Sequence, residues 1–99
     1  MASSVIPIDK PTAVQITNIS KVVWSRCGKV VTIAIYGASP ISATELTTNP
    51  PPKPITGMEC ELFYGNTWVG FLEFNPSLQV WRVAVNSGYG YGTLTYVCE

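Results

Sequence analysis

Histidine is absent from this chain of 99 residues, and charged side chains make up only 12% of it. Without histidine, the chain lacks the commonest general base and the commonest metal ligand of proteins. The six basic and six acidic residues cancel to a net charge of zero, so no overall field draws nucleic acid or an anionic membrane. We therefore expect no nucleic-acid partner, no metal and no cofactor.

Long apolar runs are missing as well. No stretch approaches the ~20 apolar residues that cross a bilayer, so we expect no membrane insertion. The first residues, MASSVIPIDKPTAV, lack the basic start and apolar block of a signal peptide. We therefore expect a protein that stays in the cytoplasm, or that leaves it within a particle assembled there.

The length and the composition favour one small domain that associates with copies of itself. Ninety-nine residues are typical of a single domain. With 46% apolar residues and so few charges, some apolar surface should remain outside the core. A homo-oligomer would bury that surface.

The clearest structural signal is a β-hairpin over residues 22–36. Two runs rich in β-branched residues, 22–26 and 29–36, flank Gly28, which suits a turn that needs a positive φ. In the second run both faces are mostly apolar, which predicts a central strand covered on both sides. One face carries Val31, Ile33 and Ile35, and the other carries Val30, Thr32 and Ala34.

The remaining sequence predicts an all-β domain over residues 13–99, preceded by an extended arm or linker over residues 1–12. Tight turns are expected at Gly65-Asn66 and at Asn75-Pro76-Ser77. About seven to eight short strands separated by turns indicate an antiparallel, jelly-roll-like β-sandwich. Besides the hairpin, strands are expected at 13–19, 58–64, 67–74, 78–85 and 93–98, with a glycine- and tyrosine-rich loop at 86–92.

The stretch from Gly37 to Gly57 is irregular. Residues 42–45, Ser-Ala-Thr-Glu, match a helix capping box, but the Asn49-Pro50 that follows leaves room for at most about one turn of helix. Residues 49–54, Asn-Pro-Pro-Pro-Lys-Pro, must be extended. We interpret them as a stiff crossover between two sheets; the alternative is a ligand for a proline-recognition domain.

Cysteines and carboxylates offer two candidate chemistries. Cys27, Cys60 and Cys98 have no CxxC spacing and no histidine beside them, which argues against zinc. Cys60 and Cys98 could pair, but the odd count favours buried free thiols. Glu59 or Glu61 with Glu73 could form a glycosidase-like pair, although polar positions on an alternating strand usually form its solvent face.

Aromatic residues supply the candidate binding site. Tyr89 and Tyr91 alternate with glycines in the sequence Ser-Gly-Tyr-Gly-Tyr-Gly, an arrangement that exposes both rings. Trp24, Trp68 and Trp81 could also face a ligand, although tryptophans on strands more often belong to the core. Flat aromatic faces beside a few polar groups hold sugar rings, so we expect Tyr89, Tyr91 and Trp68 to contact a ligand. Arg82 and Asn86 are the expected hydrogen-bond donors.

One pattern resembles a known family. Residues 24–32, Trp-Ser-Arg-Cys-Gly-Lys-Val-Val-Thr, resemble the hairpin that opens the C-terminal receptor-binding head of phage tail-fibre and baseplate proteins. The Leu-Gln-Val at 78–80, the glycine-rich loop and the closing Gly-Thr-Leu-Thr-Tyr-Val at 92–97 are similar too. The likeness runs from about Ile16 to Glu99. The proline-rich 49–54 departs from the family, as does Lys-Pro-Ile-Thr-Gly at 53–57, where members have a Leu-Pro-x-Gly-type turn.

The resemblance implies a β-sandwich head that forms a homotrimer and binds saccharides of the host cell wall without catalysis. It places the protein at the tail tip of a virion assembled in the host cytoplasm, next to other tail or baseplate proteins. Two alternatives stay open. One is a structural virion or trimerisation module with no ligand of its own, and the other is a small glycan-acting enzyme that uses Glu59 or Glu61 with Glu73.

Overall fold

The computed structural model describes residues 11–99, so the arm predicted at 1–12 lies outside it except for Pro11 and Thr12. Thr12 already joins the domain, because its N–H donates to the carbonyl oxygen of Arg26 over 2.8 Å. No helix occurs within residues 11–99. The strands are β1 (Gln15–Ile16), β2 (Val22–Cys27), β3 (Val30–Ala38), β4 (Ile41–Glu45), β5 (Met58–Tyr64), β6 (Thr67–Asn75), β7 (Val80–Val85) and β8 (Gly90–Val97).

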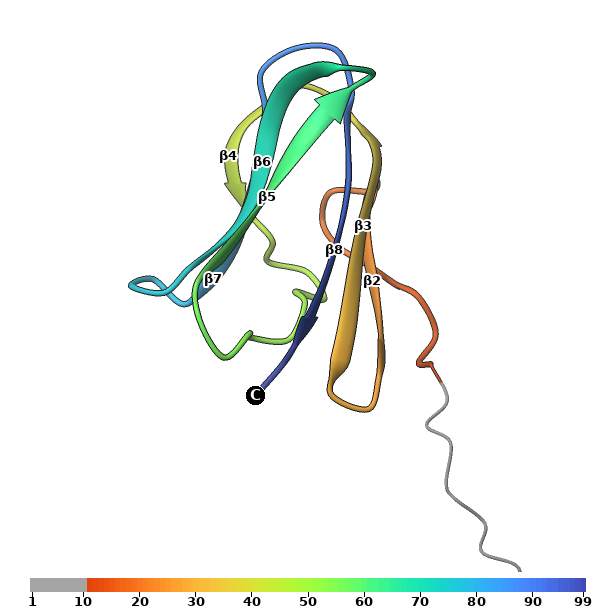
Figure 1. Cartoon of the computed structure of the whole chain (residues 1–99), viewed down its shortest axis with the longest axis vertical. Coiled ribbons are helices and arrows are strands. Elements are labelled where there is room, and N and C mark those ends of the chain that lie inside the picture. Colours follow the sequence, from red (N-terminus) through yellow and green to blue (C-terminus); the bar gives the residue numbers. More distant parts are fainter. Residues whose placement is uncertain (1–10) are drawn as a thin grey trace, which may run out of the picture.

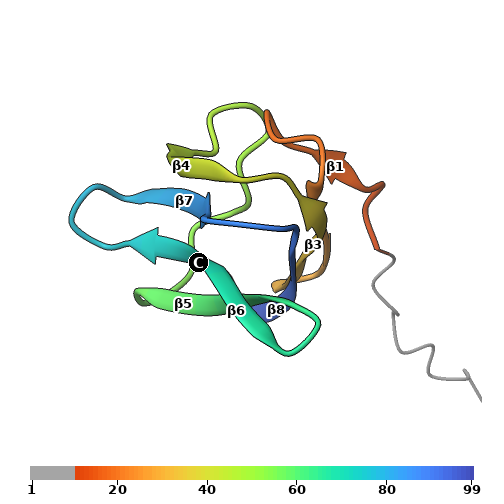
Figure 2. The same ribbon diagram turned by 90° about the horizontal axis from the view of Figure 1, so that it is seen from above.

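All eight strands belong to one antiparallel sheet in the order β1-β2-β3-β8-β5-β6-β7-β4. The strands run roughly along the long axis (Figure 1), and seen along that axis the sheet curls into an incomplete ring (Figure 2). The all-β, antiparallel part of the predicted fold is therefore confirmed. Its strands form a single curled sheet.

Side chains connect the two ends of this sheet, near β1 and after β4. Asn18 donates from Nδ2 to the carbonyl of Glu45 (3.0 Å) and accepts from the N–H of Thr47 (2.8 Å). The indole N–H of Trp24 donates to the carbonyl of Asn49 over 2.7 Å. These hydrogen bonds stand where a barrel would have a strand ladder, and they hold the curl partly closed.

The hydrophobic core fills the inside of the curl. Val31, Ile33 and Ile35 of β3 are 0–3% exposed, as their shared face predicted. The opposite face differs from the prediction of a strand covered on both sides, because Val30 is 46% exposed and Thr32 and Ala34 are only half-buried. With every described strand in one curled sheet, no second layer formed by residues 11–99 lies outside β3.

The predicted tight turns are confirmed. Gly28 and Gly65 have φ values of 60° and 61°, and each opens a two-residue hairpin loop, between Cys27 and Val30 and between Tyr64 and Thr67. The carboxamide oxygen of Asn75 accepts the N–H of Ser77 over 2.9 Å, so an Asx turn reverses the chain between β6 and β7.

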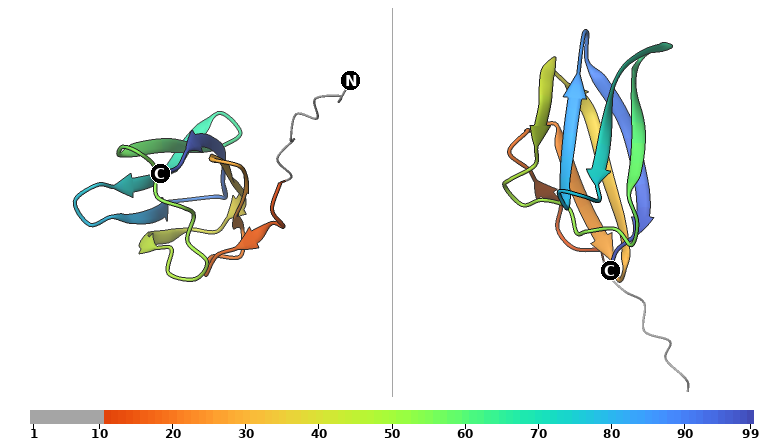
Figure 3. Two further views of the ribbon diagram at one scale, coloured as in Figure 1. Left: turned by 90° about the horizontal axis from the view of Figure 1, so that it is seen from below. Right: turned by 90° about the vertical axis from the view of Figure 1, so that its left-hand side faces the viewer.

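The proline segment crosses the lower end of the curl, from edge strand β4 to β5 (Figure 3). The carbonyl of Pro52 accepts hydrogen bonds from the Tyr96 hydroxyl (2.6 Å) and from the Trp81 indole N–H (3.3 Å). Pro51 and Pro54 are buried, and Pro54 bridges to Cys98. The segment is therefore a crossover, as predicted, but it joins two strands of one sheet and not two separate sheets. The burial of Pro51 and Pro54 argues against a proline-recognition ligand.

The capping box predicted at residues 42–45 is wrong. These residues belong to β4, which pairs with β7. The Thr44 hydroxyl donates to the Ser42 carbonyl over 2.7 Å and caps no helix. Pairing with the exposed edge of β7 satisfies the backbone groups of this segment, and that tertiary effect overrides the local motif.

Two predicted boundaries also shift. The last strand begins at Gly90, so Tyr91 lies on β8 and only Tyr89 lies in the loop. The glycines here allow close packing, because a Cβ at Gly92 would lie 2.7 Å from a methyl carbon of Leu62. At the other boundary, β7 begins at Val80, and Leu78 lies exposed in the turn.

Candidate functional site

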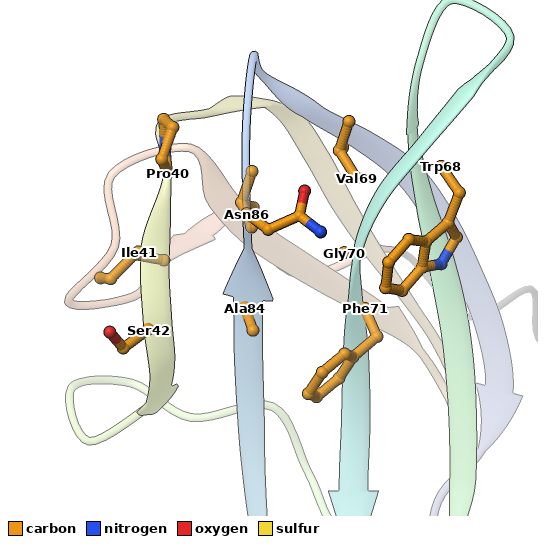
Figure 4. Close-up of a pocket in the computed structure, with 10 residues that line it drawn as sticks. Pro40, Ile41, Ser42, Trp68, Val69, Gly70, Phe71, Ala84 and Asn86 are labelled. Atoms are coloured by element: carbon orange, nitrogen blue, oxygen red, sulfur yellow. The ribbon is translucent and has the colours of Figure 1, made fainter.

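An open groove of about 540 Å³ lies on the outer face at the upper end of the sheet, where β4, β7 and β6 lie next to one another (Figure 4). Its floor is formed by small residues of β6 and β7, and its two walls come from β6 and from the start of β4. The lining residues are Pro40, Ile41, Ser42, Trp68, Val69, Gly70, Phe71, Ala84, Val85 and Asn86.

The floor of the groove is tightly built. A Cβ at Gly70 would lie 1.9 Å from the carbonyl oxygen of Ala84, so no larger residue fits there without a shift of the backbone. Val69 and Leu72 both face the core, at 1% exposure each. Two residues separate them, where strict alternation would leave only one. The extra residue accompanies the register shift between β5 and β6, which is a β-bulge.

The bulge creates the aromatic wall. With strict alternation, Trp68 and Phe71 would point to opposite faces of β6. In the structure both rings line the groove (Figure 4). Trp68 is 48% exposed, and its indole N–H donates to Oε2 of Glu61, which holds the ring in place.

Polar groups stand at the rim. The side-chain amide of Asn86 lies at the upper end of the groove, and Ser42 lies on the wall opposite the rings (Figure 4). The backbone N–H of Asn86 donates to the carbonyl of Val69 over 2.7 Å, which anchors the residue. An apolar ring surface beside an amide and a hydroxyl can bind a ligand that has both C–H faces and hydroxyl groups.

The predicted Tyr89 and Tyr91 form a second aromatic group with Tyr64 at the same upper end. The ring centroids of Tyr64 and Tyr91 are 6.4 Å apart and nearly parallel, and those of Tyr64 and Tyr89 are 5.7 Å apart, edge to face. All three side chains are 47–50% exposed. They do not line the groove, so of the predicted site residues the structure brings only Trp68 and Asn86 together there.

Arg82 lies apart from both groups. Its guanidinium forms an ion pair with Glu73 on the neighbouring strand, with Nε 3.0 Å from Oε1. Glu45 is its cross-strand neighbour on the other side. Two nitrogens of Arg82, Nε and Nη2, thus donate to Glu73. Arg82 is not part of the groove lining.

The carboxylates considered for catalysis lie close together on the outer face of β5 and β6. A hydrogen bond to Glu61 raises the pKa of the Glu59 carboxyl, and the Trp68 indole N–H, followed by Glu59, lowers the pKa of Glu61. Glu73 lies across from Glu59, and both line a second hollow of about 520 Å³.

The other candidates have structural positions. Trp81 is 2% exposed, and Trp24 packs against the core. Cys60 and Cys98 are free thiols and do not pair, and burial raises the pKa of Cys60. In the described part of the chain, no cluster of three cysteine or acidic side chains is placed to hold a metal, and no helix is long and apolar enough to span a membrane.

Phe71, Ser42 and Tyr64 are site residues that the sequence did not indicate. Phe71 depends on the bulge, and Ser42 on the strand that replaces the predicted capping box; for Tyr64, its place beside the Gly65-Asn66 turn was the available signal. No protein-family model, curated protein or solved structure matches this chain. A function for this chain therefore has to be inferred from the geometry of the groove and of the tyrosine group.

Proposed function

We propose that this domain is the non-catalytic saccharide-binding head of a phage or prophage tail protein. The observation that carries the proposal is the groove with the rings of Trp68 and Phe71 on one side and the polar groups of Asn86 and Ser42 at its rim. A sugar of the host cell wall would stack its C–H face on the rings and exchange hydrogen bonds with the amide and the hydroxyl.

The position of these groups supports the proposal. The groove and the tyrosines Tyr64, Tyr89 and Tyr91 lie at the upper end of the sheet, and the C-terminal residue lies at the lower end (Figure 1). Aromatic side chains near strand ends and loops are common at recognition surfaces. Tyr89 and Tyr91 would extend the contact with the glycan beyond the groove.

The proposal includes a homotrimer of jelly-roll-like, sandwich-type heads at the virion tail tip, assembled in the host cytoplasm and joined to other tail or baseplate proteins. Val30 and Val97 support contact between copies. They are cross-strand neighbours on β3 and β8, and they are 46% and 49% exposed. An exposed apolar pair of this kind is covered when copies associate.

A binding role accounts for the carboxylates better than catalysis does. Glu61 holds the Trp68 ring through its indole N–H, and Glu73 is paired with Arg82. Both groups thus serve to position neighbouring side chains. In this proposal the acidic residues maintain the surface next to the groove.

The test is a glycan array probed with the 99-residue protein and with a Trp68→Ala variant. We expect the protein to bind at least one bacterial cell-wall glycan and the variant to bind it about tenfold or more weakly. Leu78→Ala is the matched control, because Leu78 is exposed in the distant β6–β7 turn. Absence of binding to every glycan would favour a structural module, and glycan hydrolysis lost in Glu73→Gln would favour the enzyme.

A further inference from the structure

We propose that the ligand is a linear polysaccharide that lies across the strands, from the groove over a row of four exposed aromatic side chains. The aromatic row is Tyr36, Tyr91, Phe63 and Trp68. This inference rests on the proposed function and deepens it, because it states that several consecutive sugars are bound and not a single terminal sugar.

The strand register places the four residues in one line. Tyr36 of β3 is the cross-strand partner of Tyr91 of β8, and Tyr91 is in turn the partner of Phe63 on β5. Phe63 is paired with Trp68 on β6. The line crosses four adjacent strands, and it ends at the Trp68 ring, which lines the groove.

All four side chains point outward. Their exposed fractions are 42–48%, whereas the preceding or following residue of each strand faces the core, as Ile35, Leu62 and Val69 do at 0–3% exposure. Adjacent strands lie about 4.8 Å apart, so the row extends over roughly 14 Å. Exposed aromatic residues on four successive strands match a chain of sugar rings better than they match one sugar.

Two of the rings are held in place. The Tyr36 hydroxyl donates to the Ser20 carbonyl (3.3 Å), and the Lys21 ammonium lies 4.9 Å from the centre of the Tyr36 ring, a cation–π contact. Trp68 is fixed by Glu61. Aromatic groups that are already ordered lose little conformational entropy when a ligand binds.

The neighbours of the row favour a hydroxyl-rich ligand over a second copy of this chain. Thr93 lies two positions from Tyr91 on β8 and is exposed, as is Glu61 two positions from Phe63 on β5. At the groove the row continues to the Asn86 amide and the Ser42 hydroxyl. Polar groups along the whole row can pair with sugar hydroxyls, whereas an apolar protein face would leave them without partners.

The experiment measures how binding depends on chain length. An array carries linear bacterial oligosaccharides, each printed as a disaccharide and as a hexasaccharide of the same sugar. We expect the 99-residue protein to bind at least one hexasaccharide roughly tenfold more tightly than the matching disaccharide. Tyr36→Ala should remove that preference, since Tyr36 lies at the far end of the row from the groove. Leu78→Ala, at an exposed position in the distant turn, should change neither disaccharide binding nor the length preference.

The outcomes separate the two proposals. If disaccharide and hexasaccharide bind equally, or if Tyr36→Ala keeps the length preference, the row is not a binding surface, while the groove still stands as the site. A fall in the oligomeric mass of Tyr36→Ala, with the length preference kept, would show that the row is instead a contact between copies. Absence of binding to any oligosaccharide would overturn the proposed function together with this inference.

Discussion

Two hydrogen-bond donors hold the proline crossover against the core, and both donate to the carbonyl oxygen of Pro52. Trp81 supplies an indole N–H at 3.3 Å and Tyr96 supplies a hydroxyl at 2.6 Å. In Trp81→Phe the carbonyl keeps its hydroxyl partner, so the lost hydrogen bond costs about 1 kcal/mol. The smaller ring, in a position only 2% exposed, adds about 1–2 kcal/mol for the cavity.

We therefore expect Trp81→Phe to lower the free energy of unfolding by about 2–3 kcal/mol, which corresponds to a fall in Tm of roughly 10–20 °C for a domain of this size. Tyr96→Phe alone also leaves Pro52 with one donor. The double variant leaves a half-buried carbonyl with neither donor, so its cost should exceed the sum of the single costs by about 0.5 kcal/mol or more.

The assay is urea unfolding, followed by far-ultraviolet circular dichroism, of the parent protein, the two single variants and the double variant. The slope of free energy against urea should stay constant, so that the midpoint reports stability. Leu78→Ala, an exposed position, should stay within about 0.5 kcal/mol of the parent. Additive costs in the cycle would refute the shared acceptor, and an unchanged midpoint in Trp81→Phe would refute the lock itself.

Three further results are expected. Gly70→Ala should destabilise the domain by about 1–3 kcal/mol or more in the same assay, because its Cβ would lie 1.9 Å from the carbonyl oxygen of Ala84; a midpoint equal to the parent's would contradict the tight floor. Burial raises the pKa of the Tyr96 hydroxyl above its usual value of 10, so the unfolded state loses this proton first as the pH rises. The stability that the neutral hydroxyl contributes is therefore fully present below about pH 10 and is lost as the pH rises further. Urea midpoints measured from pH 8 to 11 should show this loss, and Tyr96→Phe should reduce it. The Tyr89→Ala, Tyr91→Ala double variant should keep its fold, since both rings are about half exposed. In the proposed function it should attach to host cells more weakly, by about 1–3 kcal/mol per stacking ring. Normal attachment would exclude these tyrosines from the site, and unfolding would assign them to the core.

Local patterns predicted the hairpin strands and the tight turns because their causes are local. The φ of Gly28 and of Gly65 near 60° is what the backbone of a two-residue hairpin loop requires. The alternation of Val31, Ile33 and Ile35 needs only a sheet with one buried face. In both cases a few neighbouring residues contain all the information, so no knowledge of the tertiary structure was needed.

The groove depended on information that no single segment contains. Phe71 joins Trp68 on one face only because a bulge adds a residue between two core positions of β6, and the bulge is defined by its pairing with β5. Ser42 reaches the opposite wall only because β4 pairs with β7 at the end of the sheet. Residues 42–45 match a capping box locally, and the unpaired edge of β7 decides against it. The candidate groove is thus a product of sheet order and register. The same holds for the proposed aromatic row, which can be tested residue by residue across four strands.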